Sequence, residues 1–162
     1  MEKYESTVKQ VASPIDRVYA KLSDLTSLQA LKDRVDDPMF EQMLNSQLPQ
    51  DKRPTPEQLA KLRANIHKME LTTDTMSGHI GPLGDITVRI VERNEPKLVK
   101  MDMEGAPVPV TLWIQLLPSN ESTCRMKVTL GAELNFFIRK MIQSKLEKGV
   151  EGIAQFLAAL PY

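Results

Sequence analysis

The sequence has 162 residues, enough for one domain with a substantial hydrophobic core. Lysine and arginine together number 21, as do aspartate and glutamate, so the formal net charge is zero. With no block of like charge, this balance argues against nucleic-acid binding by phosphate neutralisation and against a polybasic membrane anchor. We therefore expect a single domain over 1–162 with no nucleic-acid partner.

The cysteine content and the N-terminal residues indicate the compartment. The lone Cys124 cannot form an intrachain disulfide, which fits a reducing environment. The first residues are charged and lack the apolar segment of a signal peptide. No apolar run approaches the ~20 residues that a membrane-spanning helix needs. We therefore expect a soluble, cytoplasmic protein without a membrane span.

The first part of the chain predicts one strand and two short helices. Residues 4–11 are rich in β-branched side chains and predict a strand. Ser13 can cap a helix whose first position is Pro14, and an apolar face follows as far as Leu22. Leucines at helical spacing over 25–31 predict the second short helix.

A polar excursion follows at 32–68. Prolines and charges, as in LPQDKRPTP at 48–56, indicate turns and exposed surface. We expect a short helix around 40–44 and a better one from Thr55, with Gln58 as the reciprocal cap partner. Two interpretations stay open: an excursion that packs locally, or a lid over a cavity mouth.

From Met69 onward the apolar period changes to two. Five alternating segments separated by turns predict an antiparallel meander with one apolar and one wet face. The expected strands run over 69–74, 86–91, 99–104, 110–116 and 124–134, and the expected turns over 81–85, 93–97, 105–109 and 118–122.

The last segment, 136–160, predicts one long amphipathic helix of about 37 Å at roughly 1.5 Å per residue. Only this element is long enough to cover the meander, so we expect an α+β fold in which a curled antiparallel sheet of about six strands wraps around it. Gly149 and Gly152 inside the helix predict either close packing on the sheet, or a bend or room for a ligand. The expected buried stripe comprises Ile138, Met141, Ile142, Lys145, Gly149, Ile153, Phe156 and Leu160, widened by Val150 and Leu157.

Three stretches carry a family resemblance: SPIDRVYAKLSDLTSL at 13–28, GPLGDITVRIVERNEPKLVKM at 81–101 and ELNFFIRKMIQSKLEKGVEGIAQFL at 133–157. With the strand order, they resemble the START-related superfamily (SRPBCC), which includes the birch-pollen-allergen-like proteins and the polyketide cyclase/dehydrase group. The resemblance implies a helix-grip fold with a deep apolar cavity between sheet and helix. It also implies ligands such as lipids, sterols, polyketides, plant hormones or quinones, with a minority of cyclases and hydrolases. The excursion at 32–68 departs from the family pattern.

The sequence shows no catalytic or metal-binding signature. His67 and His79 fall in different predicted elements, and Cys124 has no partner at metal-ligand spacing and belongs to an inward series. Alternation places Arg89 and Asp102 on the outer face, so the three central strands present no ionisable group inward unless a β-bulge reverses one. We expect no catalytic residue, no metal and no cofactor.

These observations favour a carrier or sensor of a hydrophobic small molecule, such as a lipid, polyketide or isoprenoid-like compound. Lys145 could meet a ligand carboxylate or extend to solvent. One alternative is a protein-interaction module with a self-filled groove and an exposed apolar patch; another is a cyclase- or hydrolase-type enzyme with an inward acid, histidine or tyrosine. The predicted cavity lining is Met69, Leu71, Ile86, Val88, Ile90, Val99, Met101, Met103, Leu112, Ile114, Met126, Val128, Met141, Ile142 and Lys145.

Overall fold

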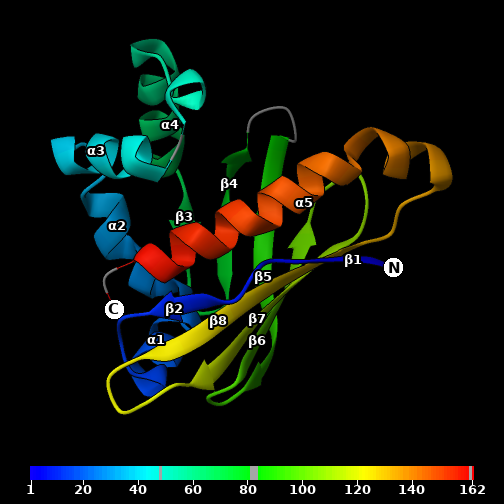
Figure 1. Ribbon diagram of the computed structural model, residues 1–162. Coiled ribbons are helices and arrows are strands. Elements are labelled where there is room, and N and C mark those ends of the chain that lie inside the picture. The colour runs from blue at the N-terminus through cyan, green and yellow to red at the C-terminus, as the bar shows by residue number, and fades with distance from the viewer. Residues whose placement is uncertain (48, 81–83, 161) are drawn as a thin grey trace.

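The computed structural model describes residues 1–47, 49–80, 84–160 and 162, which form one curled sheet, one long helix and a group of shorter helices (Figure 1). The strands are β1 (Glu2–Glu5), β2 (Lys9–Val11), β3 (Glu70–Leu71), β4 (Thr75–Ile80), β5 (Gly84–Asn94), β6 (Leu98–Glu104), β7 (Val110–Pro118) and β8 (Cys124–Ala132). The α-helices are α1 (Ile15–Leu22), α2 (Gln29–Asp33), α3 (Pro38–Gln47), α4 (Pro56–His67) and α5 (Phe136–Ala159), with 3-10 turns η1 (Leu25–Leu28) and η2 (Gln50–Lys52).

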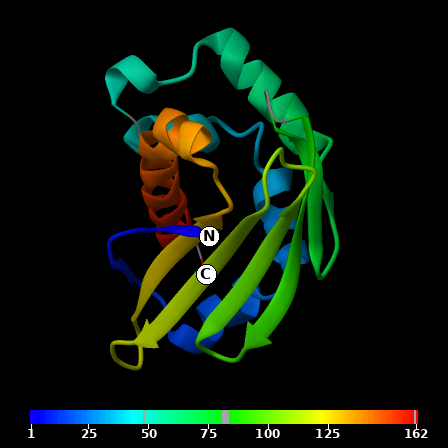
Figure 2. The ribbon, with the colours of Figure 1, turned by 90° about the vertical axis from the view of Figure 1, so that its right-hand side faces the viewer.

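All the strands belong to one antiparallel sheet in the order β1-β8-β7-β6-β5-β4-β3, with β2 also paired to β8. The α+β helix-grip architecture is therefore confirmed, with eight strands in place of about six. Figure 2 shows the curled sheet on one side of the molecule and α5 on the other.

The predicted first strand is two strands. Between β1 and β2, the backbone N–H of Ser6 donates to the carbonyl of Val128 at 2.8 Å, and the Ser6 hydroxyl accepts from the N–H of Val128 at 2.9 Å. The side chain thus replaces a backbone acceptor, and the ladder is interrupted there while both strands stay on β8.

The predicted strand at 69–74 is largely wrong. Only β3 forms there, and the chain reverses at once because the N–H of Thr75 donates to the Thr72 hydroxyl at 3.0 Å and the N–H of Thr72 to the Thr75 carbonyl at 2.9 Å. The strand beside β5 is β4, whose sequence TMSGHI alternates only weakly because Gly78 stands between the apolar Met76 and Ile80. The predicted turn at 81–85 lies mostly outside the described residues, and β5 already begins at Gly84.

A β-bulge in β5 explains why the apolar Val91 stands at a position where alternation over 86–91 predicts a polar residue. The β5–β6 register shifts between Ile90 and Glu92, so Val91 is the additional residue and is exposed. Beyond the bulge, Arg93 stands opposite the buried Val99 and so turns to the inner face. Its guanidinium donates to the carbonyl of Ser23 at 2.9 Å and to Asp74 at 2.6 Å. The bulge therefore converts one charged residue into a tie between the sheet and the end of α1.

The cover of the apolar face is shared between two helices. Helix α5 packs on β8, β1 and β2, whereas α1 packs on β6 and β7. Val18, Tyr19 and Leu22 of α1 are buried, as their spacing predicted, but the N-cap position is Pro14 and Ser13 provides no cap. The prediction that α5 alone covers the meander is therefore wrong.

The buried side of α5 differs from the predicted stripe. Val150, which the prediction included, is fully buried, but so is Ala154, which it did not include, whereas Met141 is 75% exposed and Lys145 is exposed. The helix is thus rotated about its axis relative to the expectation. Both helical glycines, Gly149 and Gly152, are exposed with open space where a Cβ would stand, so neither interpretation of them is supported.

The polar excursion has a small hydrophobic core of its own. This second core consists of Val35, Phe40 and Leu59, with Met43, Leu44 and Ile66 packed against it. Helix α4 begins with the predicted capping box, in which Thr55 and Gln58 bond each other's backbone N–H at 3.2 and 3.0 Å. The excursion therefore packs locally, and its helices rise beside the sheet (Figure 1).

One carboxylate fastens the N-terminal segment to α5. Glu151 accepts from the N–H and the hydroxyl of Thr7 at 2.9 and 2.6 Å and pairs with the ammonium of Lys9. The Lys9 ammonium and the two Thr7 donors lower the pKa of Glu151 from its ordinary 4.5 to about 2.

This depressed pKa predicts how stability depends on pH. A carboxylate whose pKa falls on folding stabilises the protein above its unfolded pKa, and the contribution is lost as the pH falls from about 4.5 to about 2. Because the Glu151 side chain is still 31% exposed, we expect Glu151→Gln to lower the free energy of unfolding at pH 7 by only about 1–2 kcal/mol. Near pH 2 it should have almost no effect, as urea unfolding at both pH values would show.

Glu147→Gln is the matched control, because Glu147 is exposed on the same helix and accepts one long bond from Gln143 at 3.3 Å. The control should change little at either pH. A loss in Glu151→Gln that persisted undiminished at pH 2 would contradict this account.

Candidate functional site

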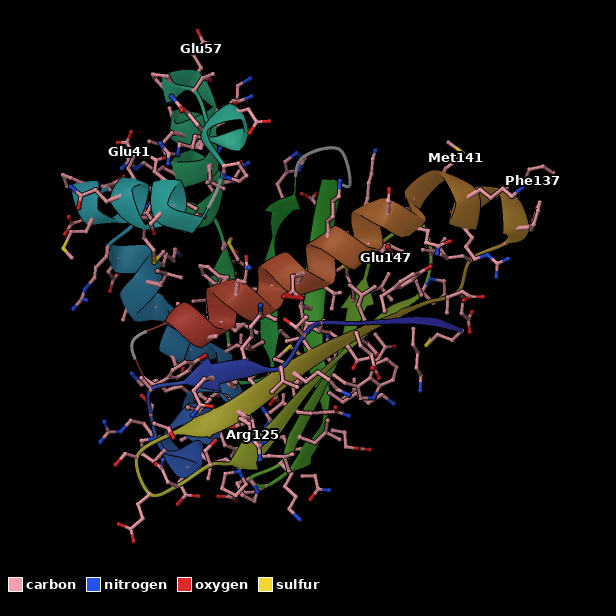
Figure 3. The ribbon with its side chains drawn as sticks, viewed as in Figure 1. Glu41, Glu57, Arg125, Phe137, Met141 and Glu147 are labelled. Carbon is pink, nitrogen blue, oxygen red and sulfur yellow. The ribbon has the colours of Figure 1, made fainter. Side chains whose placement is uncertain are left out.

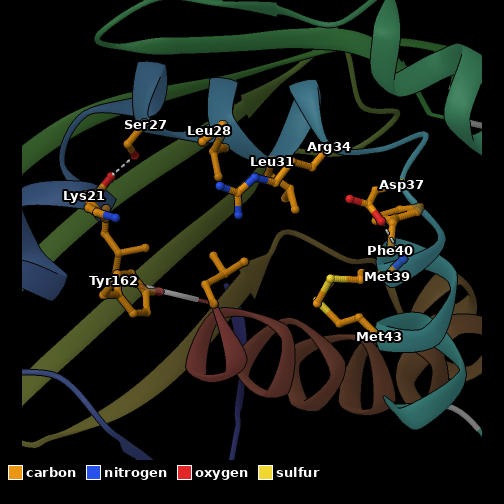
Figure 4. A pocket seen from close by; sticks show the side chains of 13 residues that line it. Lys21, Ser27, Leu28, Leu31, Arg34, Asp37, Met39, Phe40, Met43 and Tyr162 are labelled. Atoms are coloured by element: carbon orange, nitrogen blue, oxygen red, sulfur yellow. Dashed lines mark hydrogen bonds between the residues drawn. The ribbon is translucent and has the colours of Figure 1, made fainter.

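A cleft of about 650 Å³ lies between the first short helices and the C-terminal end of α5 (Figure 4). Residues of α1, η1, α2 and α3 form one side, and the end of the chain forms the other. Its apolar lining includes Leu22, Leu28, Leu31, Met39, Phe40, Met43 and Leu160, and its polar lining consists of Lys21, Ser27, Arg34, Asp37 and Tyr162.

The second core holds the outer wall of the cleft in place. Arg63 of α4 donates to the carbonyl of Val35 at 2.8 Å and so ties the turn between α2 and α3 to α4. Lys32 at the end of α2 donates to the carbonyl of Met69 at 2.6 Å. Phe40 belongs both to the second core and to the cleft lining. The same packing that stabilises the excursion therefore positions one wall of the cleft.

The opposite wall is the end of the chain. The Tyr162 hydroxyl donates to the carbonyl of Leu157 at 2.6 Å, which folds the last described residue back onto α5. Burial raises the pKa of Tyr162, with a further contribution from Cys124. The phenol is therefore neutral at physiological pH and serves as part of the wall.

The charged side chains of the cleft differ in their partners. Asp37 accepts from the backbone N–H of Met39 at 3.0 Å and so caps the start of α3. The backbone of Lys21, rather than its ammonium group, is fixed here: its carbonyl accepts from the Ser27 hydroxyl at 2.5 Å. Among the residues that the structure describes, the Arg34 guanidinium makes no hydrogen bond and no ion pair, and Figure 4 shows it reaching into the cleft between Leu28 and Leu31.

The space between sheet and helix is much smaller. A cavity of about 50 Å³ is lined by Val88, Met101, Met103, Leu112 and their neighbours, including Ile153 of α5. About 300 Å³ is the lower end of the usual range for small-molecule sites. The side chains of the groove fill most of it themselves.

The predicted lining residues fall into three groups. The buried residues come together in the main core, a second group is half-buried, and two residues of α5 are exposed. The buried group is Ile86, Val88, Ile90, Val99, Met101, Ile114, Met126 and Val128; the half-buried group is Met69, Leu71, Met103, Leu112 and Ile142; Met141 and Lys145 are exposed. The structure thus assembles most of the set but leaves little space inside it, and its role in ligand binding stays a prediction.

The residues of the larger cleft were not predicted as a site. Leu28 and Leu31 stood out only as one apolar side of a short helix, and Phe40 and Met43 as members of a short helix in a polar excursion. Apolar side chains that recur inside a polar segment were the available signal, and the lid interpretation of 32–68 was the nearest expectation.

Two ionisable groups next to the inner face, Asp102, which lines the 50 Å³ cavity, and Arg93, are held by hydrogen bonds to neighbouring groups. Asp102 accepts from the Thr111 hydroxyl at 2.9 Å, and the reversed Arg93 is engaged by Ser23 and Asp74. The Tyr4 hydroxyl is buried, without a hydrogen-bond partner among the described residues, and burial raises its pKa. Tyr4 lines neither cavity, so a ligand in either one does not reach it.

Metal-binding groups are not assembled within the described ranges, where no three His, Cys, Asp or Glu side chains converge. His67 contacts Asp36 at 2.7 Å, and His79 contacts Asp85 at 3.3 Å, on separate parts of the surface. In the same described part of the chain, none of the helices combines the length and hydrophobicity needed to cross a bilayer.

An exposed apolar patch lies at the start of α5, far from the cleft (Figure 3). Phe136, Phe137 and Met141 are 55%, 77% and 75% exposed. The interaction-module alternative required such a patch together with the absence of a ligand-sized cavity. The structure has the patch and a groove filled by its own side chains, but it also has the 650 Å³ cleft.

Comparison with solved structures identifies the fold. Norcoclaurine synthase from Thalictrum flavum, in complex with dopamine and hydroxybenzaldehyde, superposes with a TM-score of 0.64 at 14% identity, covering 97% of this chain and 84% of that chain. The chain has the helix-grip fold of the birch-pollen-allergen-like proteins. The fold that the resemblance implied is thereby confirmed.

Two bacterial structures extend this helix-grip comparison. A protein from Thermobifida fusca matches with a TM-score of 0.56 at 15% identity, covering 98% of this chain and 91% of that one. A conserved protein from Geobacillus kaustophilus matches with a TM-score of 0.51 at 15% identity, covering 97% and 95%. No protein-family model and no curated protein matches the sequence.

The helix-grip core makes a prediction about Cys124. The thiol is fully buried on β8, and burial raises its pKa, so it is neither accessible nor ionised at neutral pH. We expect iodoacetamide to leave the native protein unmodified and to alkylate it once in 6 M guanidinium, as intact mass spectrometry would show. Rapid alkylation under native conditions would mean that the core beside Tyr162 opens.

Proposed function

We propose that the protein binds a hydrophobic small molecule, as a carrier or sensor, in the cleft between the short N-terminal helices and the end of α5. The observation that carries the proposal is the 650 Å³ volume of this cleft together with its largely apolar lining. Small-molecule sites typically occupy about 300–1,000 Å³ and combine apolar walls with a few polar groups. The cleft fits this description, and the cavity under the sheet does not.

The lining suits an adaptable apolar ligand. Leu28 and Leu31 present one apolar wall, Leu160 another, and Met39 and Met43 add flexible side chains. Removing apolar ligand surface from water contributes about 25 cal/mol per Å², and association costs offset part of that gain. Methionines can repack around different shapes, so we expect related ligands to bind with similar affinity.

The comparisons support a ligand-binding use of the fold without naming the ligand. The norcoclaurine synthase structure holds dopamine and hydroxybenzaldehyde, two small aromatic molecules. At 14% identity the likeness does not extend to chemistry. A lipid, a polyketide or an isoprenoid-like compound all fit the apolar lining, and we expect the protein to work as a single domain in the cytoplasm.

The test of this proposal is to fill the cleft. Leu31→Trp puts a large ring into the space, so we expect it to weaken binding of the fluorescent fatty acid 11-(dansylamino)undecanoic acid at least tenfold. Leu62→Trp is the control, because Leu62 is 37% exposed on α4 and does not line the cleft. Fluorescence titration of the wild type and both variants measures the dissociation constants.

A third variant, Met103→Trp, fills the small cavity under the sheet instead. If Met103→Trp abolished binding while Leu31→Trp left it intact, the ligand would occupy the groove between sheet and α5, and the cleft would be the wrong site. Circular dichroism of each variant establishes that it is folded.

A further inference from the structure

We propose that the ligand of the cleft is an amphipathic acid whose single anionic group is bound by Arg34. The inference rests on the proposed function, because it concerns a ligand in the same cleft. It goes further in naming the chemical class, an apolar body with one carboxylate-like end, and the residue that selects it.

Hydrogen bonds fix the backbone of Arg34 and leave its side chain available to a ligand. It is the C-cap residue of α2, its N–H donates to the carbonyl of Leu31 at 3.1 Å, and its carbonyl accepts from the N–H of Asp37 at 3.0 Å. These bonds fix the turn between α2 and α3 and direct the side chain into the cleft (Figure 4). The position is thus set by the fold and not by a partner of the guanidinium.

The guanidinium of Arg34 is exposed at the cleft and available to an acceptor, unlike the guanidinium groups of several other arginines in this protein. Within the described part of the chain, it makes no hydrogen bond or ion pair. Four other arginines donate to carboxylates or carbonyls: Arg63 to Val35, Arg89 to Glu104, Arg93 to Asp74 and Arg139 to Glu2. An arginine beside leucines, with five N–H donors available, is suited to a bidentate carboxylate.

The other charges of the cleft favour an anion as well. Among the described residues of the lining, Lys21 is a second cation, and the acid Asp37 already accepts the N–H of Met39. The lining therefore carries two positive charges and one negative charge.

The end of α5 decides where the anion lies. The last carbonyls of a helix carry a partial negative charge, which repels an anion. Leu160, the C-cap of α5, also lines the cleft. The anionic group should therefore lie at Arg34, with the apolar body extending toward Leu160 and Met43.

The experiment compares an acid with its neutral ester. 11-(Dansylamino)undecanoic acid and its methyl ester share the fluorophore and the chain, so the ratio of their dissociation constants isolates the charge. We expect the wild type to bind the acid about tenfold more tightly than the ester, as a charge-assisted hydrogen bond allows. In Arg34→Gln the ratio should fall to about one, because the variant loses affinity for the acid.

Arg125→Gln is the matched control. Arg125 is exposed on β8, away from the cleft (Figure 3), and should keep the full preference for the acid. Circular dichroism of Arg34→Gln and Arg125→Gln establishes that both variants are folded.

Each of the other outcomes would overturn a stated part of the proposal. Equal binding of acid and ester by the wild type would remove the anion site and leave the proposed function standing. A preference that survived in Arg34→Gln would place the anion elsewhere, for example at Lys21. Failure of the wild type to bind either probe would overturn both the inference and the proposed function.

Discussion

The second core, where Val35, Phe40 and Leu59 pack together, is the constraint on which the candidate site depends. It holds α2 and α3 against α4, and Arg63 and Lys32 fasten this group to neighbouring backbone carbonyls. Because the apolar side chains of the excursion pack against each other, its helices do not need to pack against α5. The space that remains between them and the end of α5 is the cleft. Local packing, one of the two interpretations of 32–68, thus leaves open the cleft that we propose as the ligand site.

The fold was predictable wherever one physical signal dominated. The period-two pattern gave β6, β7 and β8, and the capping box with Thr55 placed the start of α4, because each depends on residues close in sequence. The break after β1 depends on a bond between Ser6 and Val128, and the brief β3 on a turn formed by two threonines. Contacts of this kind leave no periodicity, so the sequence pattern could not show them.

The site was less predictable for a related reason. Helical spacing showed that α5 is amphipathic but left its rotation uncertain by part of a turn, and the structure buries Val150 and Ala154 while exposing Met141 and Lys145. The alternation of the sheet correctly marked its inner face. It could not show that the inner side chains fill the groove to within about 50 Å³. Cavity volume depends on how far elements stand apart, which follows from tertiary packing and not from spacing.

The central claim is that the ligand site lies beside the excursion and not under the sheet, and the methionines provide a direct measurement. Met39 and Met43 line the cleft, whereas Met101 and Met103 line the small cavity under the sheet. Protein labelled with ¹³C at the methionine methyl groups can be titrated with 11-(dansylamino)undecanoic acid and followed by NMR. The account predicts that the signals of Met39 and Met43 shift with ligand while those of Met101 and Met103 stay. The reverse pattern would contradict it and place the ligand between the sheet and α5.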